Sequence, residues 1–178
     1  EHGGQVISTT IDKYCYITLR ELPPFFEHKH RVVYAKLENV KNFDEIKHPV
    51  VRAALSDLDA GKLGYEIHHD GDLPARSGTG SSSSFAVGLY HAYCTLHNID
   101  VNKRSLADYA IYLEQELLGE SVGYQDQIAV AFGGLNVIKF NPGGSYDVEQ
   151  VQISKEREIE FQDHLMLFFT GQTRFSSD

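Results

Sequence analysis

The stretch Pro74-Ala75-Arg76-Ser77-Gly78-Thr79-Gly80-Ser81-Ser82-Ser83-Ser84 places two glycines, one residue apart, directly before four serines. An apolar pattern with helical spacing begins immediately after it, at Phe85, Leu89 and Leu96. The stretch therefore predicts a glycine turn that leads into the N-terminus of a helix. The first backbone N–H groups of a helix have no partner within the helix, and the positive end of the helix dipole lies there. Glycine lets the backbone approach an anion closely and serine adds hydroxyl groups, so the pattern favours a phosphate site.

A Gly/Ser-rich stretch is also typical of a flexible linker. A linker does not normally continue without a break into an amphipathic helix, and this continuity favours the phosphate site. The stretch lacks the Gly-Lys-Ser/Thr ending of a Walker A loop and the third glycine of a dinucleotide-binding fingerprint.

A second stretch, Glu114-Gln115-Glu116-Leu117-Leu118-Gly119-Glu120-Ser121-Val122-Gly123-Tyr124-Gln125-Asp126-Gln127, places a helix glutamate ahead of the pattern Gly-x-x-Asp-Gln. Together with Pro-x-x-x-Gly-x-Gly-Ser-Ser at residues 74–82, it resembles the motifs of the GHMP small-molecule kinases, which include the galactokinases, homoserine kinases and mevalonate kinases. Within that superfamily, the four serines before Phe85 and the segment Phe168-Phe169-Thr170-Gly171-Gln172-Thr173-Arg174 are similar to the D-glycero-α-D-manno-heptose 7-phosphate kinases. The resemblance extends over nearly the whole chain.

The resemblance implies an α+β fold of the ribosomal-protein-S5-domain-2-like type, in which helices pack on a mixed β-sheet. It further implies ATP as phosphoryl donor, Mg²⁺ as cofactor, and the anomeric hydroxyl of a sugar phosphate as acceptor, with D-glycero-D-manno-heptose 7-phosphate giving the 1,7-bisphosphate. Two alternatives stay open: a sugar-1-kinase of the fucose or galactose type, and a catalytically silent module that binds a sugar phosphate or a nucleotide.

The residues themselves leave simpler roles open for each member of the implied site. Asp126 is also a plausible helix N-cap, and Glu114 taken alone is typical of an exposed helix glutamate. Arg76 and Arg174 offer donor forks that match a phosphate, but surface arginines commonly form salt bridges. By the resemblance, ATP phosphates are bound by Gly78, Gly80, Ser81, Ser82 and Ser83, Mg²⁺ by Ser82 and Glu114, the substrate by Arg76, Gly123, Gln125 and Arg174, and the reacting hydroxyl by Asp126 as catalytic residue.

Composition restricts the remaining possibilities. The chain has 178 residues, 42% of them hydrophobic, and a formal net charge of −9, which argues against a nucleic-acid partner. Cys15 and Cys94 form neither a disulfide framework nor a zinc spacing, and no apolar run is long enough to span a membrane. We therefore expect a cytoplasmic protein without a membrane or nucleic-acid partner, and the oligomeric state stays open.

The sequence starts at Glu1, and the resemblance implies an upstream strand with a basic residue and a C-terminal half with a glycine-rich third motif, neither of which is visible. Residues 1–178 are therefore expected to be a GHMP kinase N-terminal domain that lacks both. Thr79 also replaces the leucine that is usual between the two glycines.

Hydrophobic periodicity predicts the remaining elements. Pro49 at a helix start and Gly119 after a helix end are typical of their positions, and Ser105 with Asp108 resembles a capping box. His68 and His69 are adjacent on a predicted strand, so they point to opposite faces and do not share a metal ion. Strands are expected within residues 6–19 with a break at 12–13, at 30–37, 65–70, 135–140, 146–153 and 165–170, and helices at 49–58, after 80, at 100–119 and at 127–132.

Overall fold

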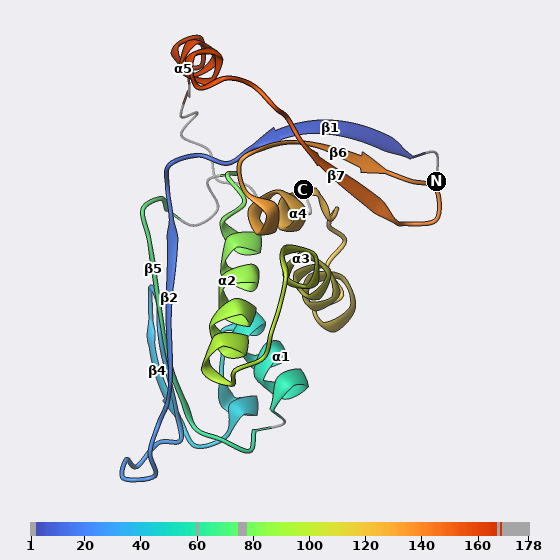
Figure 1. Cartoon of the computed structure of the whole chain (residues 1–178). Coiled ribbons are helices and arrows are strands. Elements are labelled where there is room, and N and C mark those ends of the chain that lie inside the picture. The colour runs from blue at the N-terminus through green and yellow to red at the C-terminus, as the bar shows by residue number, and fades with distance from the viewer. Residues whose placement is uncertain (1–2, 60, 75–77, 167, 169–178) are drawn as a thin grey trace.

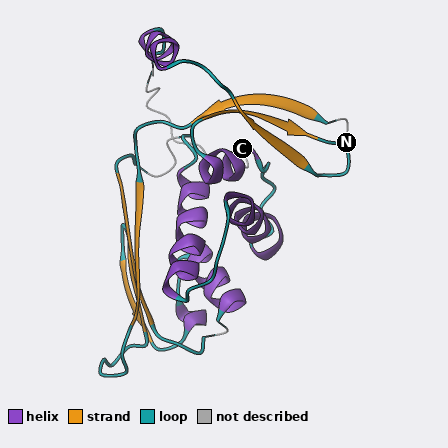
Figure 2. Cartoon of the chain, in the orientation of Figure 1, coloured by secondary structure: helices purple, strands orange, loops and turns teal. Residues whose placement is uncertain are grey.

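The computed structural model describes residues 3–59, 61–74, 78–166 and 168, and within these it contains two β-sheets and five α-helices (Figure 1). One sheet runs alongside the long helix α2, and the other lies across one end of the helical layer, above α3 and α4 (Figure 2). The strands are β1 Gly4–Thr9, β2 Cys15–Glu21, β3 His30–Val33, β4 Leu37–Val40, β5 Tyr65–Gly71, β6 Leu135–Phe140 and β7 Tyr146–Gln150. The helices are α1 Pro49–Leu58, α2 Ser81–Leu96, α3 Lys103–Tyr112, α4 Gln125–Phe132 and α5 Lys155–Asp163, with a 3₁₀ turn at Phe43–Glu45 and a π-helical turn at Leu113–Leu117.

The two sheets differ in their strand directions. The larger sheet has the order β2-β5-β3-β4, with β5 antiparallel to β2 and parallel to β3, so it is mixed. The smaller sheet has the order β1-β6-β7 and is antiparallel throughout, with Gly4 opposite Phe140 and Tyr146 opposite the same Phe140. This arrangement confirms the predicted α+β fold with a mixed sheet packed by helices.

Helix α1 forms as its sequence predicts, over Pro49–Leu58. Proline is favoured at the first helical position because its missing N–H would have no partner there. The side chain of His48 caps the helix by accepting a hydrogen bond from the N–H of Val51. Val51 and Leu55, spaced by one helical turn, are both buried.

Two hydrophobic clusters hold the layers together. The larger one joins the mixed sheet to α1 and α2, and the smaller one joins α3 and α4 to the antiparallel sheet. Ala131 of α4 packs against both clusters, so α4 is fixed at the place where the two halves of the fold meet. The fully buried side chains include Ile46, Val51, Leu55, Tyr65, Ile67, Cys94, Leu113, Ile128 and Ile138.

The predicted capping box at Ser105 is wrong. Asn102 is the N-cap of α3, and its Oδ1 accepts a hydrogen bond of 2.9 Å from the N–H of Ser105. Asp108 instead accepts a hydrogen bond of 2.7 Å from the hydroxyl of Tyr146. Its carboxylate therefore joins α3 to the antiparallel sheet rather than closing the helix end.

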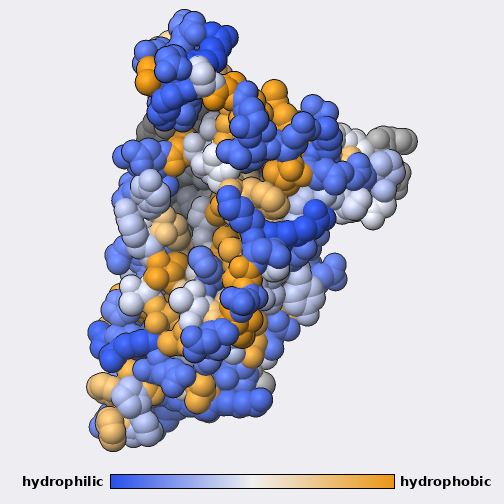
Figure 3. Space-filling view, in the orientation of Figure 1, coloured by the Kyte–Doolittle hydropathy of each residue, from blue (hydrophilic) through white to orange (hydrophobic). Residues whose placement is uncertain are grey.

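The C-terminal run predicted as a buried strand falls mostly outside the described residues. Leu165, Met166 and Phe168 are described; they are exposed and lie in no strand. The preceding helix α5 carries no buried residue and presents a largely hydrophilic surface (Figure 3). None of the helices in the described segments is long and apolar enough to cross a membrane.

Glu38 joins β4 to the start of α1 and gives a testable stability prediction. Glu38 is only 8% exposed. Its carboxylate accepts hydrogen bonds from the backbone N–H groups of Lys47 and His48 and from the hydroxyl of Tyr34. Burial alone raises the pKa of Glu38, but these three hydrogen bonds outweigh it and lower the pKa below its usual value. An acid with a lowered pKa stabilises the fold above its unfolded-state pKa, and this stabilisation is lost as the pH falls through the folded-state pKa.

We therefore expect Glu38→Gln to lower the free energy of unfolding by roughly 1–3 kcal/mol at neutral pH. The difference from wild type should shrink as the pH falls below about 4. Urea unfolding at both pH values measures it, with Glu149→Gln as control, because Glu149 pairs with Lys139 on an exposed surface. An equal loss of stability at both pH values would contradict the role of the Glu38 charge.

Candidate active site

The glycine turn before α2 has the conformation that the sequence predicts. Gly78 and Gly80 have φ values of +74° and +73°, which side chains other than glycine rarely adopt. Gly80 occupies the N-cap position, and α2 begins at Ser81 with a backbone hydrogen bond of 2.8 Å from the N–H of Ser84 to the carbonyl of Gly80. The first turn of α2 therefore presents its N–H groups beyond the helix end, as an anion site requires.

Helix α4 lies against this turn, at the N-terminal end of α2 (Figure 1). A Cβ atom built on Gly80 would lie 3.8 Å from Cγ2 of Val130, which is van der Waals contact. The glycine turn and α4 are thus neighbours in space, although about 50 residues separate Gly80 from Val130 in the sequence. The second motif is brought to the first by this contact.

Glu114 reaches the first turn of α2 from the π-helical turn at Leu113–Leu117. The residue is only 2% exposed, and its Oε1 accepts a hydrogen bond of 3.0 Å from the hydroxyl of Ser82. Its Oε2 accepts hydrogen bonds from the hydroxyl of Ser83 and from Nε2 of Gln127. The structure therefore brings together Ser82 and Glu114, the pair that the resemblance implies for Mg²⁺, although the sequence alone favoured an exposed Glu114.

The electrostatics of Glu114 fit a cation. Burial raises the pKa of this carboxyl, and the negative charge of Glu120 adds to the effect, while the hydrogen bonds from Gln127, Ser82 and Ser83 partly oppose it. A buried carboxylate is costly unless a positive charge compensates it. The Oγ of Ser82 and Oε1 of Glu114 are the hard oxygen donors that Mg²⁺ prefers.

The protein supplies only part of such a coordination sphere. The described residues hold no group of three or more His, Cys, Asp or Glu side chains that could bind a metal ion. Mg²⁺ in nucleotide sites usually has one or two protein ligands, with phosphate and water oxygens as the others. Ser82 and Glu114 match that pattern.

Asp126 lies in the first turn of α4, directly before Gln127. Tyr124 occupies the N-cap position, so the alternative role of Asp126 as helix N-cap is wrong. Its side chain is exposed, and within the described ranges it makes no hydrogen bond or ion pair. The next residue, Gln127, is hydrogen-bonded to Glu114. Asp126 therefore lies on the helix that borders the candidate cation site.

The other predicted substrate residues have different outcomes. Gly123 and Gln125 are exposed at the start of α4, in a connection that begins at Gly119 with a φ of +66° and is held by a hydrogen bond of 2.7 Å from Gln115 to the carbonyl of Val122. Arg76 and Arg174 lie outside the described residues. Ser83 is buried, with its hydroxyl directed to Glu114.

Gln127 is the site residue that the sequence did not single out. It stands in the Gly-x-x-Asp-Gln pattern without an assigned role, yet it is 1% exposed and donates to Glu114. A polar residue next to Ile128 at the start of an apolar helix was the signal that could have indicated its inward direction.

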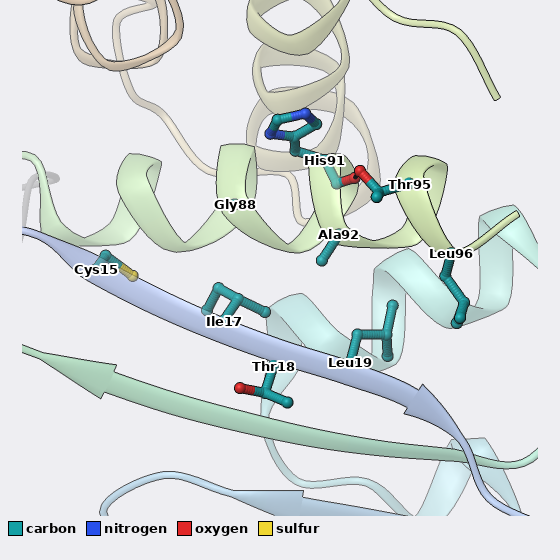
Figure 4. Close-up of a pocket in the computed structure, with 9 residues that line it drawn as sticks. All are labelled: Cys15, Ile17, Thr18, Leu19, Gly88, His91, Ala92, Thr95 and Leu96. Atoms are coloured by element: carbon teal, nitrogen blue, oxygen red, sulfur yellow. Dashed lines mark hydrogen bonds between the residues drawn. The ribbon is translucent and has the colours of Figure 1, made fainter. Parts of the chain in front are cut away.

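A cavity of about 550 Å³ lies elsewhere, between β2 and the middle of α2 (Figure 4). Figure 3 shows hydrophobic side chains along this furrow. Its lining is mainly apolar and includes Ile17 and Leu19 from β2 and Gly88, Ala92 and Leu96 from α2. It therefore contains none of the residues of the candidate active site.

The positive φ of Gly80 predicts a stability effect. We expect Gly80→Ala to lower the free energy of unfolding by about 1–2 kcal/mol, because alanine is strained in the left-handed region. Gly123→Ala is the matched control, since Gly123 has no positive φ and an added Cβ there would meet nothing within 4 Å. Urea unfolding measures both variants, and equal midpoints for Gly80→Ala and wild type would show that the turn is not constrained as described.

Comparisons with known proteins agree with this geometry. Residues 47–134, which include the glycine turn, Glu114 and Asp126, match the GHMP kinases N terminal domain family. The chain is 27% identical to D-glycero-alpha-D-manno-heptose 7-phosphate kinase of Campylobacter jejuni subsp. jejuni, over 100% of this chain and 55% of the relative. It is also 27% identical to galactokinase of Pyrococcus furiosus, over 96% of this chain and 48% of the relative.

Among solved structures, the fold is similar to that of a D-glycero-D-manno-heptose 1-phosphate kinase from Bacteroides thetaiotaomicron. The TM-score is 0.74 at 23% identity, over 86% of this chain and 53% of that protein. The chain thus spans about half the length of the curated relatives it matches. On the family match, the fold and the two motifs together, residues 47–134 of this chain carry the N-terminal domain of the GHMP kinases.

Proposed function

We propose that this protein is an ATP-dependent sugar kinase that phosphorylates the anomeric hydroxyl of D-glycero-D-manno-heptose 7-phosphate to give the 1,7-bisphosphate. The observation that carries the proposal is the 3.0 Å contact between Ser82 and the buried Glu114, beside the helix that bears Asp126. Similarity to the Campylobacter heptose 7-phosphate kinase over the whole chain supports this substrate.

The glycine turn and α2 would hold the ATP phosphates. Gly78 and Gly80 keep the backbone open to a close anion, and the N–H groups of the first turn face the helix end. Ser81, the first residue of α2, would add its hydroxyl to this site. Ser82 and Glu114 would bind Mg²⁺. When bound, Mg²⁺ supplies positive charge to the phosphate oxygens as negative charge develops on the leaving ADP.

Asp126 would receive the sugar hydroxyl and orient it or accept its proton. In the transfer, the anomeric oxygen forms a bond to the γ-phosphorus while the bond from that phosphorus to the β,γ-bridging oxygen breaks. ADP leaves with the bonding electron pair, and the hydroxyl proton passes to the Asp126 carboxylate. An exposed carboxylate on a short, well-packed helix can act in this way because it is held in place yet accessible.

The sugar and its phosphate would lie near the start of α4. Gly123 and Gln125, which closely precede Asp126 in the sequence, would contact the sugar, and an arginine fork at Arg76 or Arg174 would bind the 7-phosphate through paired hydrogen bonds. We further propose that residues 1–178 are the N-terminal, ATP- and sugar-binding domain of a longer enzyme. A cytoplasmic location fits its need for ATP and its two free cysteines.

Galactose is the second candidate acceptor, because the galactokinase of Pyrococcus furiosus is as similar in identity as the heptose kinase. The chemistry at the anomeric hydroxyl would be the same. A silent binding module is the alternative from another class.

The test is ADP release by the full-length protein with Mg²⁺ and ATP, across heptose 7-phosphate, galactose, fucose and other sugars. Turnover on heptose 7-phosphate supports the proposal in full. Turnover on galactose or fucose alone would keep the reaction and replace the substrate. Nucleotide binding without turnover on any sugar would instead favour the binding module.

A further inference from the structure

Gln127 is buried against the carboxylate of Glu114 but is only half satisfied. Its Nε2 donates to Oε2 of Glu114, while its Oε1, also buried, has no hydrogen-bond partner among the described residues. A buried polar atom without a partner costs free energy, so a carboxamide here is not the side chain that best stabilises the fold. The chain accepts this cost at Gln127 together with one interaction, the hydrogen bond that Nε2 donates to Glu114.

The hydrogen bond from Gln127 makes the two carboxylate oxygens of Glu114 different from each other. Among the described residues, Oε2 of Glu114 accepts hydrogen bonds from Gln127 and Ser83, whereas Oε1 accepts one from the hydroxyl of Ser82 alone. A carboxylate fixed by donors on one oxygen presents its other oxygen in a defined direction. Oε1 and the Ser82 hydroxyl oxygen, 3.0 Å apart, therefore form one edge of the candidate cation site.

Gln127 also joins this site to the residue that meets the sugar. It directly follows Asp126 in the first turn of α4. A hydrogen bond from Gln127 to Glu114 thus fixes the start of α4, and with it the Asp126 backbone, relative to the first turn of α2.

We propose that Gln127 is a positioning residue for the divalent cation, a role that rests on the proposed function. It holds Oε2 of Glu114 so that Oε1 faces the cation with Ser82, and it sets the position of Asp126 relative to that cation. Outer partners of metal ligands commonly contribute 10- to 100-fold to metal affinity.

The test measures Mn²⁺ affinity, as a spectroscopic substitute for Mg²⁺, in the full-length protein saturated with ADP. Electron paramagnetic resonance of free Mn²⁺ gives the affinity without any sugar turnover. Gln127→Met keeps the side-chain length and removes the donor, and Gln127→Asn keeps the amide but shortens its reach. The matched control is Asn136→Leu, because Asn136 is also a buried carboxamide, hydrogen-bonded to the carbonyl of Gly133 away from Glu114.

We expect both Gln127 variants to bind Mn²⁺ about 10-fold or more weakly. ADP affinity in EDTA should stay close to wild type, and Asn136→Leu should leave Mn²⁺ affinity unchanged. In turnover, the Mg²⁺ concentration for half-maximal rate should rise while the sugar KM changes little. Thermal melting shows which variants are folded, so that a weakened site is compared only between folded proteins.

Wild-type Mn²⁺ affinity in a folded Gln127 variant would overturn the positioning role, even if the wild type phosphorylates a sugar. An equal loss of affinity in Asn136→Leu would overturn it too, because the effect would then be general loosening. Weak Mn²⁺ binding in the Gln127 variants, with no sugar phosphorylated by the wild type, would support the positioning role and reject the proposed function.

Discussion

Asp126→Asn is expected to lower kcat by about 10²- to 10⁴-fold while nucleotide affinity stays near wild type. Asparagine has nearly the same shape as aspartate but cannot accept the hydroxyl proton. Because Asp126 is exposed and its side chain makes no hydrogen bond or ion pair within the described ranges, the change should not disturb the fold. ADP release and calorimetric binding of ADP measure the two effects separately.

The matched control for this variant is Glu120→Gln. It removes a negative charge from an exposed residue of the connection before α4 and leaves Asp126 unchanged. We expect its kcat to stay within a few-fold of wild type. If Asp126→Asn turned over at the wild-type rate, Asp126 would not be the group that receives the hydroxyl.

Glu114→Gln is expected to lower activity but not to lower stability in the absence of divalent cations. Loss of the proposed cation ligand should lower kcat/KM by roughly 10²-fold or more, equivalent to about 2.7 kcal/mol or more of lost transition-state stabilisation. In the absence of divalent cations, however, the melting temperature should equal or exceed that of wild type. Replacing a buried carboxylate by a neutral amide removes an uncompensated charge, and burial already raises the pKa of Glu114.

Glu116→Gln is the control, because Glu116 lies in the same π-helical turn and is exposed. Its activity and melting temperature should both match wild type. Thermal unfolding in EDTA and steady-state kinetics at saturating Mg²⁺ provide the measurements. A Glu114→Gln protein that is strongly destabilised in EDTA would show that the main role of Glu114 is to stabilise the fold and not to bind a cation.

Local chemistry explains which elements the sequence predicts well. Pro49 and the apolar spacing of Val51 and Leu55 define α1, and the turn residues at 141–144 define the hairpin of β6 and β7. The positive φ of Gly80 follows from a glycine directly before a serine-rich helix start. In each case the determining residues lie within a few positions of one another.

The sequence was less informative where distant segments decide the outcome. Residues 100–119 were predicted as one helical unit, but the chain changes to a π-helical turn at Leu113, and this turn directs Glu114 inward. The burial of Glu114 depends on Ser82, Ser83 and Gln127, which are 13 to 32 residues away. Helical periodicity alone cannot show such contacts, and therefore residue patterns predict neither the burial of Glu114 nor its hydrogen bond with Gln127.

Phosphorus NMR of the full-length protein with ATP, Mg²⁺ and heptose 7-phosphate tests the proposed phosphorylation, since it identifies the product rather than ADP alone. We expect the γ-phosphate signal of ATP to be replaced by the signal of a new phosphate on the anomeric carbon, beside the unchanged 7-phosphate signal. Asp126→Asn should show neither change at the same enzyme concentration within the time that the wild type needs for complete conversion. A protein that binds Mg²⁺ and ATP but forms no anomeric phosphate on this or any other sugar would contradict it.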